Sequence, residues 1–133
     1  MIKTELNVGN IVSYRDKLCI VRKISAASED VSLTDEDNNL ICAPVADLRG
    51  VRVSVHILRR LDIDVNMTNQ GTAVMAYTAR LDDCHLSYHI SDYTLYCSQM
   101  NSINNIVSYK APFLHQIQNV LRLFNHEITL KTK

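Results

Sequence analysis

The chain has 133 residues, with 14 basic and 14 acidic side chains and a hydrophobic content of 47%. This length fits a single compact domain over residues 1–133, whose core needs neither metal nor disulfide bonds. The formal net charge of zero argues against a nucleic-acid binder, because such proteins concentrate lysine and arginine on one face. The chain has only three glycines and no phosphate-binding glycine motif, which argues against a nucleotide-dependent enzyme.

Residues 1–50 predict four short β-strands that are separated by polar turns. Alternation of apolar and polar side chains places these strands at 11–14, 18–24, 31–33 and 40–43. Arg15-Asp16-Lys17 is predicted to be a three-residue hairpin connection, and Pro44 ends the fourth strand because it has no N–H to donate. Four short strands within about fifty residues are typical of a small barrel, so residues 1–50 are predicted to form an SH3-like β subdomain.

Residues 51–64 predict a short helical connection. Ser54 suits the N-cap of a helix over 54–61, where apolar side chains recur at helical spacing. The following stretch, 62–71, is rich in Asn, Thr, Asp and Gly, so we expect a loop that joins the two halves of the chain.

Residues 72–109 predict an antiparallel β-meander. Apolar and polar side chains alternate, β-branched and aromatic residues are frequent, and Asp82-Asp83 suits a turn between two strands. Together with the helix that follows, this meander makes the fold class α+β and mostly antiparallel β.

A closing helix from Pro112 to Phe124 is the clearest predicted element. Pro112 suits its first position, where a missing N–H costs nothing, and Asn125 suits a left-handed residue after its end. The apolar side chains fall on one stripe: Leu114, Ile117, Leu121 and Phe124. We expect this stripe to cover the meander, so residues 72–133 are predicted to form one subdomain.

The opposite side of this helix carries a polar stripe that is rich in amides. Its members recur at helical spacing: His115, Gln118, Asn119 and Arg122. One interpretation is a face that meets only water, and the other is a hydrogen-bonding stripe that ties the helix to a loop or to a partner. Amides outnumber Glu and Lys here, which is unusual for a solvated face, so these four residues are predicted partner-binding residues.

Cys84, His85 and His89 are the residues that most resemble a catalytic or metal-binding group. A cysteine nucleophile needs a histidine within hydrogen-bond reach, and a metal ion needs ligands that converge. On a strand, however, Cys84 and His85 point to opposite faces. His85 and His89 lie about 13 Å apart at about 3.3 Å per residue. We therefore predict no enzyme, no catalytic residue, no metal site and no cofactor, with a small hydrolase as the weakest alternative.

The remaining cysteines and acids favour structural roles. The four cysteines have no CxxC spacing and are expected to be buried apolar residues of a reduced protein: Cys19, Cys42, Cys84 and Cys97. Asp35 with Asp37, and Asp62 with Asp64, lack the glycine and the final glutamate of a calcium-binding loop, so they are expected to be ordinary loop acids.

The basic cluster of the chain consists of arginines on either side of the predicted helix: Arg49, Arg52, Arg59 and Arg60. Asp47, Asp62 and Asp64 lie nearby in sequence, so local ion pairing is the first interpretation. Contact with phosphate is the alternative, which would make the protein a nucleic-acid-binding accessory protein that uses the SH3-like part.

The two halves of the chain differ in charge. Residues 1–64 hold nine Lys or Arg and ten Asp or Glu, whereas residues 65–133 hold five and four but contain five of the six tyrosines. Interface cores lose charge and gain tyrosine, although polar uncharged residues also coat ordinary sheets. The second half is therefore a candidate for contact with a protein partner or with a second copy in a homo-oligomer.

Two motifs resemble a known family. Glu5-Leu6-Asn7-Val8-Gly9-Asn10-Ile11-Val12 and Phe113-Leu114-His115-Gln116-Ile117-Gln118-Asn119 are similar to the ends of a family of small proteins from gut Bacteroidetes, their crAss-like phages and mobile elements. That family has Gly at the position of Asn125, and its middle helix ends in Gly-Phe where this chain has Leu61-Asp62-Ile63. The resemblance carries no activity and implies a phage or mobile-element accessory protein.

The function expected from these observations is a non-enzymatic protein-interaction or structural module, either a virion component or a binder of a host factor. The first residues lack the apolar segment of a signal peptide, and no run of residues approaches a membrane span. A cytoplasmic location is therefore expected, in the host cell or the virion if a phage encodes the protein, with no membrane partner.

Overall fold

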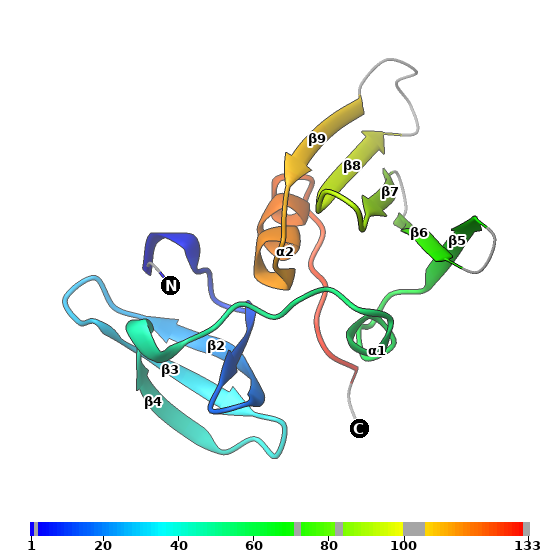
Figure 1. The fold of residues 1–133 in the computed structure, drawn as a ribbon. Helices are drawn as coiled ribbons and strands as arrows, with labels where there is room; N and C mark the ends of the chain where they lie inside the picture. Colours follow the sequence, from blue (N-terminus) through cyan, green and yellow to red (C-terminus); the bar gives the residue numbers. More distant parts are fainter. Residues whose placement is uncertain (2, 71–72, 82–83, 100–105, 132–133) are drawn as a thin grey trace. The chain divides into compact units, whose positions relative to one another are not determined.

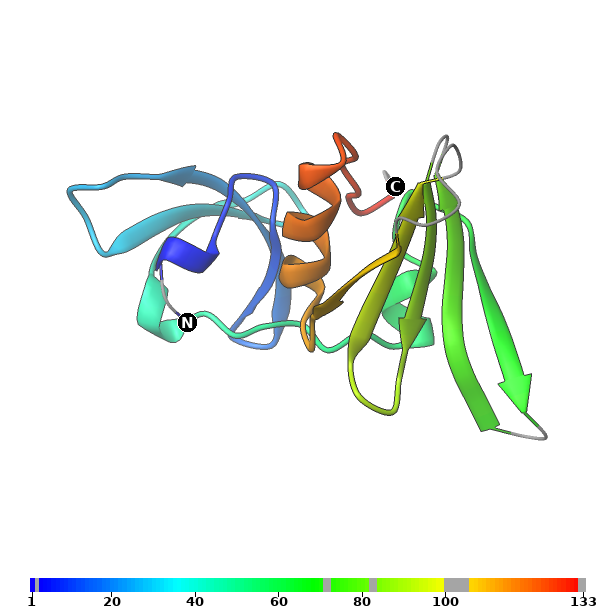
Figure 2. The same ribbon diagram turned by 90° about the horizontal axis from the view of Figure 1, so that it is seen from above.

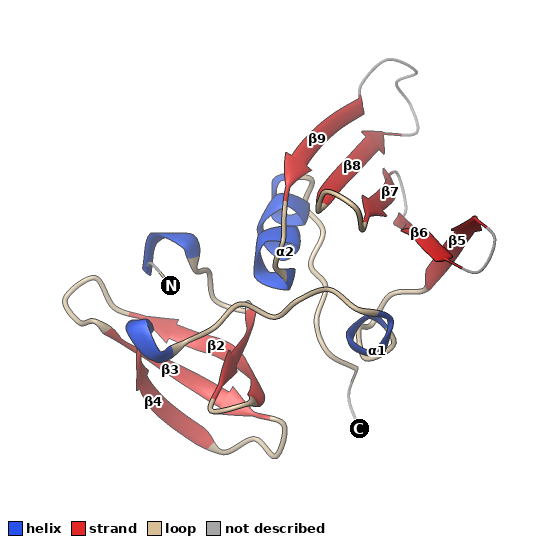
Figure 3. Ribbon diagram, in the orientation of Figure 1, coloured by secondary structure: helices blue, strands red, loops and turns tan. Residues whose placement is uncertain are grey.

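The computed structural model describes residues 1, 3–70, 73–81, 84–99 and 106–131. It is mostly antiparallel β, with two sheets, a short central helix and a C-terminal helix (Figures 1 and 3), which confirms the predicted α+β class. Two compact units divide the chain. Unit 1 comprises Met1–Arg52 and Phe113–Leu123, and unit 2 comprises Val53–Pro112 and Phe124–Lys133.

The sheet of unit 1 contains four antiparallel strands in the order β1-β2-β3-β4. The strands are β1 (Ile11–Tyr14), β2 (Lys17–Ile24), β3 (Asp30–Asp35) and β4 (Leu40–Pro44). The strands curve (Figure 2), and unit 1 has a core of buried apolar side chains. This core includes Leu6, Val12, Cys19, Val21, Val31, Leu33, Ala43, Val45 and Leu48. The four strands lie where the sequence predicts them, and the likeness to an SH3-like barrel stays a prediction.

The connection between β1 and β2 is one residue shorter than predicted. Tyr14 pairs with Lys17, so only Arg15 and Asp16 form the turn. Both turn residues have positive φ, 51° and 63°, as in the mirror-image turns whose twist matches that of the flanking strands. The prediction of a three-residue connection was wrong because neither residue is the glycine or asparagine that usually marks such a turn.

The sheet of unit 2 contains five antiparallel strands in the order β5-β6-β7-β8-β9. The strands are β5 (Val65–Gln70), β6 (Ala73–Leu81), β7 (Cys84–His89), β8 (Thr94–Gln99) and β9 (Ile106–Lys110). The prediction of a loop over 62–71 was wrong for the residues of β5. The polar side chains suggested a loop, but the backbone of this segment pairs with β6 through hydrogen bonds that do not depend on the side chains. The predicted turn Asp82-Asp83 lies outside the described residues.

The central helix α1 spans Val55–Leu58 and begins as predicted, with Ser54 Oγ accepting a hydrogen bond from Ile57 N at 3.3 Å. It ends before Leu61 because the next residues pair with the end of the chain. Leu61 forms a β-bridge with Leu130, and Asp62 N donates to Thr129 O at 2.9 Å.

The C-terminal helix α2 spans Leu114–Leu123, two residues later than the predicted start at Pro112. Phe113 N donates to the side chain of Gln116 at 3.0 Å, which is half of a capping box. Asn125 has a φ of 63° and so confirms the predicted left-handed residue after the helix.

The apolar stripe of α2 is buried at Leu114, Ile117 and Leu121, while Phe124 is half-buried and follows the helix. The helix belongs to unit 1, where it contacts β1 and where Leu114 N donates to Val51 O at 2.8 Å. The compact units therefore differ from the predicted subdomain of residues 72–133. Among the described residues, no helix combines the length and apolar character needed to cross a bilayer.

Candidate functional sites

Gln118 of α2 covers the free edge of β1. Its Oε1 accepts a hydrogen bond from Ile11 N at 2.7 Å, and its Nε2 donates to Gly9 O at 3.0 Å. Two residues further along this edge, Ser13 exchanges two backbone hydrogen bonds of 2.9 Å with Arg49. The side-chain amide thus takes the place that a backbone peptide of a neighbouring strand would occupy.

Asn119, in the next position of the helix, joins the same segment through three further hydrogen bonds. Its Oδ1 accepts from Asn7 Nδ2 and from Asn10 Nδ2, both at 2.9 Å, and its Nδ2 donates to Glu5 O at 2.8 Å. Asn10 is fully buried, and its Oδ1 accepts from Asn7 N at 2.8 Å. We call these four amide side chains the amide network: Asn7, Asn10, Gln118 and Asn119.

Gly9 gives the segment before β1 the shape that the amide network requires. Its φ is +97°, a conformation that an L side chain rarely adopts, and its N–H donates to Val21 O at 2.8 Å. Arg122, one turn beyond Gln118, donates to Val8 O. The chain is therefore held on both sides of Gly9 by α2.

His115 is the fourth member of the predicted polar stripe, and its side chain is only 1% exposed. Burial lowers its pKa from the ordinary 6.5, and the Glu5 carboxylate, with Oε2 3.9 Å from Nε2, partly opposes this shift. Neither ring nitrogen has a hydrogen-bond partner among the described residues. Its ring stacks on Phe113 with centroids 6.0 Å apart.

The polar stripe of α2 therefore binds to a segment of its own chain. The solvated-face interpretation was wrong for His115 and Gln118, which are 1% and 4% exposed. A partner would reach these two side chains only if α2 left β1, so the predicted partner-binding role gains no support from their position. Sequence reasoning missed Asn7 and Asn10 as the hydrogen-bond partners of Asn119, although both motifs of the family resemblance meet in this network.

The predicted arginine cluster is divided between the two units, since Arg49 and Arg52 belong to unit 1 and Arg59 and Arg60 to unit 2. Arg49 donates to Ala46 O at 3.1 Å and to Leu48 O at 3.2 Å. The guanidinium of Arg52 lies 4.7 Å from the centre of the Phe113 ring. Two of the four guanidinium groups thus have partners inside unit 1.

Cys84 and His85 lie on opposite faces of β7, as predicted, with Cys84 1% exposed and His85 exposed. Burial, with a smaller contribution from Cys84, raises the pKa of Cys97 to about 12. A nucleophilic cysteine needs the reverse shift, so Cys97 is not suited to that role. In the described part of the chain, no three His, Cys, Asp or Glu side chains converge as metal ligands.

The predicted loop acids take part in turns. Asp35 accepts hydrogen bonds from Asp37 N at 3.0 Å and from Asn39 N at 2.9 Å. These bonds, above all the one from Asn39 N, lower the pKa of Asp35. Asp62 Oδ1 accepts from Thr129 N at 3.0 Å, so this carboxylate fixes the C-terminal tail.

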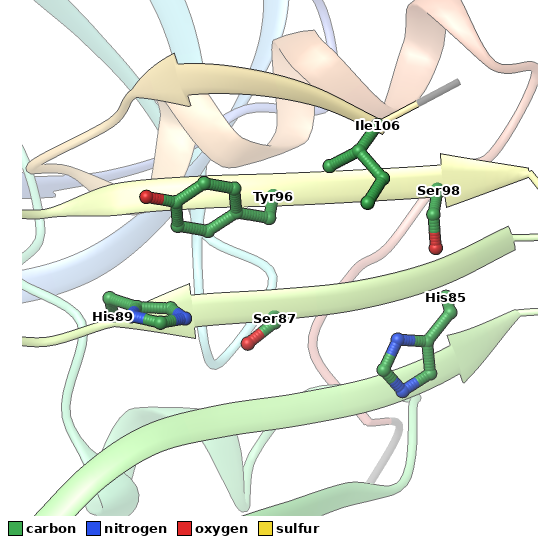
Figure 4. Close-up of a pocket in the computed structure, with 6 residues that line it drawn as sticks. All are labelled: His85, Ser87, His89, Tyr96, Ser98 and Ile106. Atoms are coloured by element: carbon green, nitrogen blue, oxygen red, sulfur yellow. The ribbon is translucent and has the colours of Figure 1, made fainter. Parts of the chain in front are cut away.

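The outer face of the unit 2 sheet carries a shallow hollow over β7, β8 and the start of β9 (Figure 4). It is lined by His85, Ser87, His89, Tyr96, Ser98 and Ile106. The rings of His89 and Tyr96 meet edge to face with centroids 4.7 Å apart. None of these lining residues is acidic. The hollow offers hydroxyl and imidazole groups for hydrogen bonds, and Ser98 of β8 lies opposite His85 of β7 in the strand register.

Strand β9 is the edge of the unit 2 sheet, and its neighbour among the described residues is β8 alone. Its side chains Ile106 and Val107 are 65% and 41% exposed. Ala111 N donates to Tyr93 O at 2.8 Å on the β8 side. Because backbone groups alternate along a strand, the N–H and C=O groups of Ile106, Ser108 and Lys110 point to the open edge.

Comparison of the chain with models of known protein families, with curated proteins and with solved structures finds no match.

Proposed function

We propose that this protein is a non-enzymatic protein-interaction or structural module that binds a protein partner through the sheet of unit 2. The observation that carries the proposal is the open edge of β9, where Ile106 and Val107 are exposed and backbone groups face outward. Exposed edge strands are templates for pairing with another chain. The low charge and high tyrosine content of residues 65–133 agree with a surface that a partner covers.

The two motifs at the ends of the chain support a wider assignment as an accessory protein of a phage or mobile element, present in the host cytoplasm or in the virion. Residues of both motifs make contacts in the amide network. Unit 1 needs these contacts to close its sheet, so both motifs have a role in folding. In this proposal unit 1 is the folded support and unit 2 carries the binding surface.

A photo-reactive amino acid at Ser108 tests the proposal in cells that produce the protein. We expect ultraviolet light to join position 108 to protein, and the same group at the exposed Ala27 of unit 1 to give no such product. Adducts to nucleic acid at 108, or no adduct at all, would contradict a protein-binding role for this edge.

A further inference from the structure

We propose that the partner of β9 is a second copy of this chain, and that two β9 strands pair antiparallel about a two-fold axis at Ser108. This inference rests on the proposed function and names the partner. It would join two five-stranded sheets into one sheet of ten strands across the two copies. The argument comes from the backbone, the side-chain register and the other sheet edges.

The backbone of β9 suits a two-fold pair. The outward groups belong to Ile106, Ser108 and Lys110, so Ser108 lies at the centre of the outward row. An antiparallel pair centred there joins Ser108 to Ser108, and Ile106 to Lys110 on either side. Each of these is a hydrogen-bonded pair, because the two residues exchange both of their N–H···O bonds.

The side chains in this register are complementary. Ile106 lies opposite Lys110 of the second copy, so no like charges meet, and the lysine stem covers apolar surface. Lys110 Nζ is also held by Asp92 O at 2.7 Å. On the other face, Val107 lies opposite Tyr109, a pairing of a β-branched and an aromatic side chain that stabilises sheets. The pair thus covers both of the exposed apolar residues, Ile106 and Val107.

The other sheet edges have features that oppose such pairing. Gln118 and Arg49 occupy the edge of β1. Strand β4 ends in Pro44, which has no N–H. The register of β5 against β6 shifts between Thr68 and Asn69, and such bulges twist an edge away from pairing. No register shift interrupts β9 against β8, so β9 is the regular edge among the described strands.

A β9 pair of five residues buries little surface, so the dimer is expected to be weak and concentration-dependent. Sedimentation velocity of the full chain from about 1 μM to about 1 mM covers the range of such affinities. We expect the wild-type chain to shift from monomer to dimer within this range, with no larger species, because the pairing uses one edge of each copy.

Charge substitutions at position 106 test the register. Ile106→Lys sets two ammonium groups against each other and should weaken the dimer at least about tenfold, the effect of about 1.4 kcal/mol. Ile106→Glu sets a carboxylate against Lys110 and should preserve the dimer. Met67→Lys, on an exposed residue of β5, is the matched control and should leave the dimer unchanged.

Three results would overturn the inference: a monomer at every concentration, a dimer that Ile106→Lys leaves intact, or a dimer that Met67→Lys abolishes. The cross-linking experiment at position 108 tests the proposed function separately. A monomer whose position 108 still cross-links to a different protein contradicts only the second copy as partner. A monomer with no protein adduct at 108 contradicts both.

Discussion

Strands β1 and β9 are both edges of antiparallel sheets, but the chain treats them in opposite ways. The edge of β1 is covered by polar side chains, since Gln118 binds Ile11 N and Gly9 O. The edge of β9 carries exposed Ile106 and Val107 and has no such cover among the described residues. The amide-rich face of α2, which resembles a binding surface in sequence, thus closes the edge of β1. Strand β9, with its exposed apolar side chains, leaves the edge of the other sheet open.

Removal of the Gln118 side chain, which covers the edge of β1, should have the largest effect on the free energy of unfolding. Gln118→Ala leaves the buried N–H of Ile11 and the carbonyl of Gly9 without partners, and two such losses cost about 2–4 kcal/mol in the free energy of unfolding. Urea denaturation followed by circular dichroism measures this loss. Gln116→Ala is the matched control, because Gln116 accepts a single bond, from Phe113 N at 3.0 Å, and should cost about 1 kcal/mol. Equal effects would contradict the role given to Gln118.

Proline substitutions on β9 should distinguish its two sides. Tyr109→Pro removes an N–H that faces β8 and should cost about 2 kcal/mol or more in the free energy of unfolding. Ser108→Pro removes an N–H that faces outward and should cost less than about 0.5 kcal/mol in a monomer. Thermal unfolding at low protein concentration compares the two variants. The reverse order would show that the open edge lies on the other set of residues.

The pH dependence of stability should report on His115. Its pKa is lowered in the folded protein, mainly by burial, from the ordinary 6.5, so below pH 6.5 the unfolded chain binds more protons than the folded one. The contribution is complete above pH 6.5 and is lost as the pH falls from there through the folded pKa. Urea denaturation at several pH values should show this decline in the wild type and in the control His85→Gln. It should be reduced in His115→Phe, and an unchanged decline there would contradict the assignment.

Cysteine labelling should have the smallest effect on the stability of the protein. It measures how fast each thiol reacts and leaves the folded chain intact. Cys42 is exposed, so the prediction that all four cysteines are buried was wrong for this residue, whereas Cys19, Cys84 and Cys97 are buried. Burial raises the pKa values of Cys19 and Cys97. A thiol reagent at neutral pH should therefore modify Cys42 rapidly and the other three only in urea. Rapid modification of Cys84 in the folded protein would reopen the case for a reactive thiol.

The sequence predicted elements whose signals are local. Strand alternation in residues 11–43, the Ser54 cap and the left-handed Asn125 depend on neighbours in the chain, and the structure confirms them. The sequence did not predict β5. Its mostly polar residues give no alternation of apolar and polar side chains, and the hydrogen bonds that make it a strand come from its partner strand.

The candidate sites were harder to predict because their partners are distant in sequence. The amide stripe of α2 was recognised as unusual, but periodicity alone does not show that Asn119 meets Asn7 and Asn10, more than one hundred residues away. The open edge of β9 depends on strand order, which side-chain patterns do not encode. Local signals thus predicted most of the helices and strands. Tertiary pairing determined which sheet edge is covered and which is open.

Amide hydrogen exchange, measured by NMR at a low and a high protein concentration, tests the contrast between the two edges most directly. We expect the Ile11 amide, bound by Gln118, to be protected at both concentrations. The outward amides of Ile106, Ser108 and Lys110 should exchange rapidly at low concentration and become protected at high concentration. A rapidly exchanging Ile11 amide, or protection of the three β9 amides in the dilute monomer, would contradict the account of one closed and one open edge.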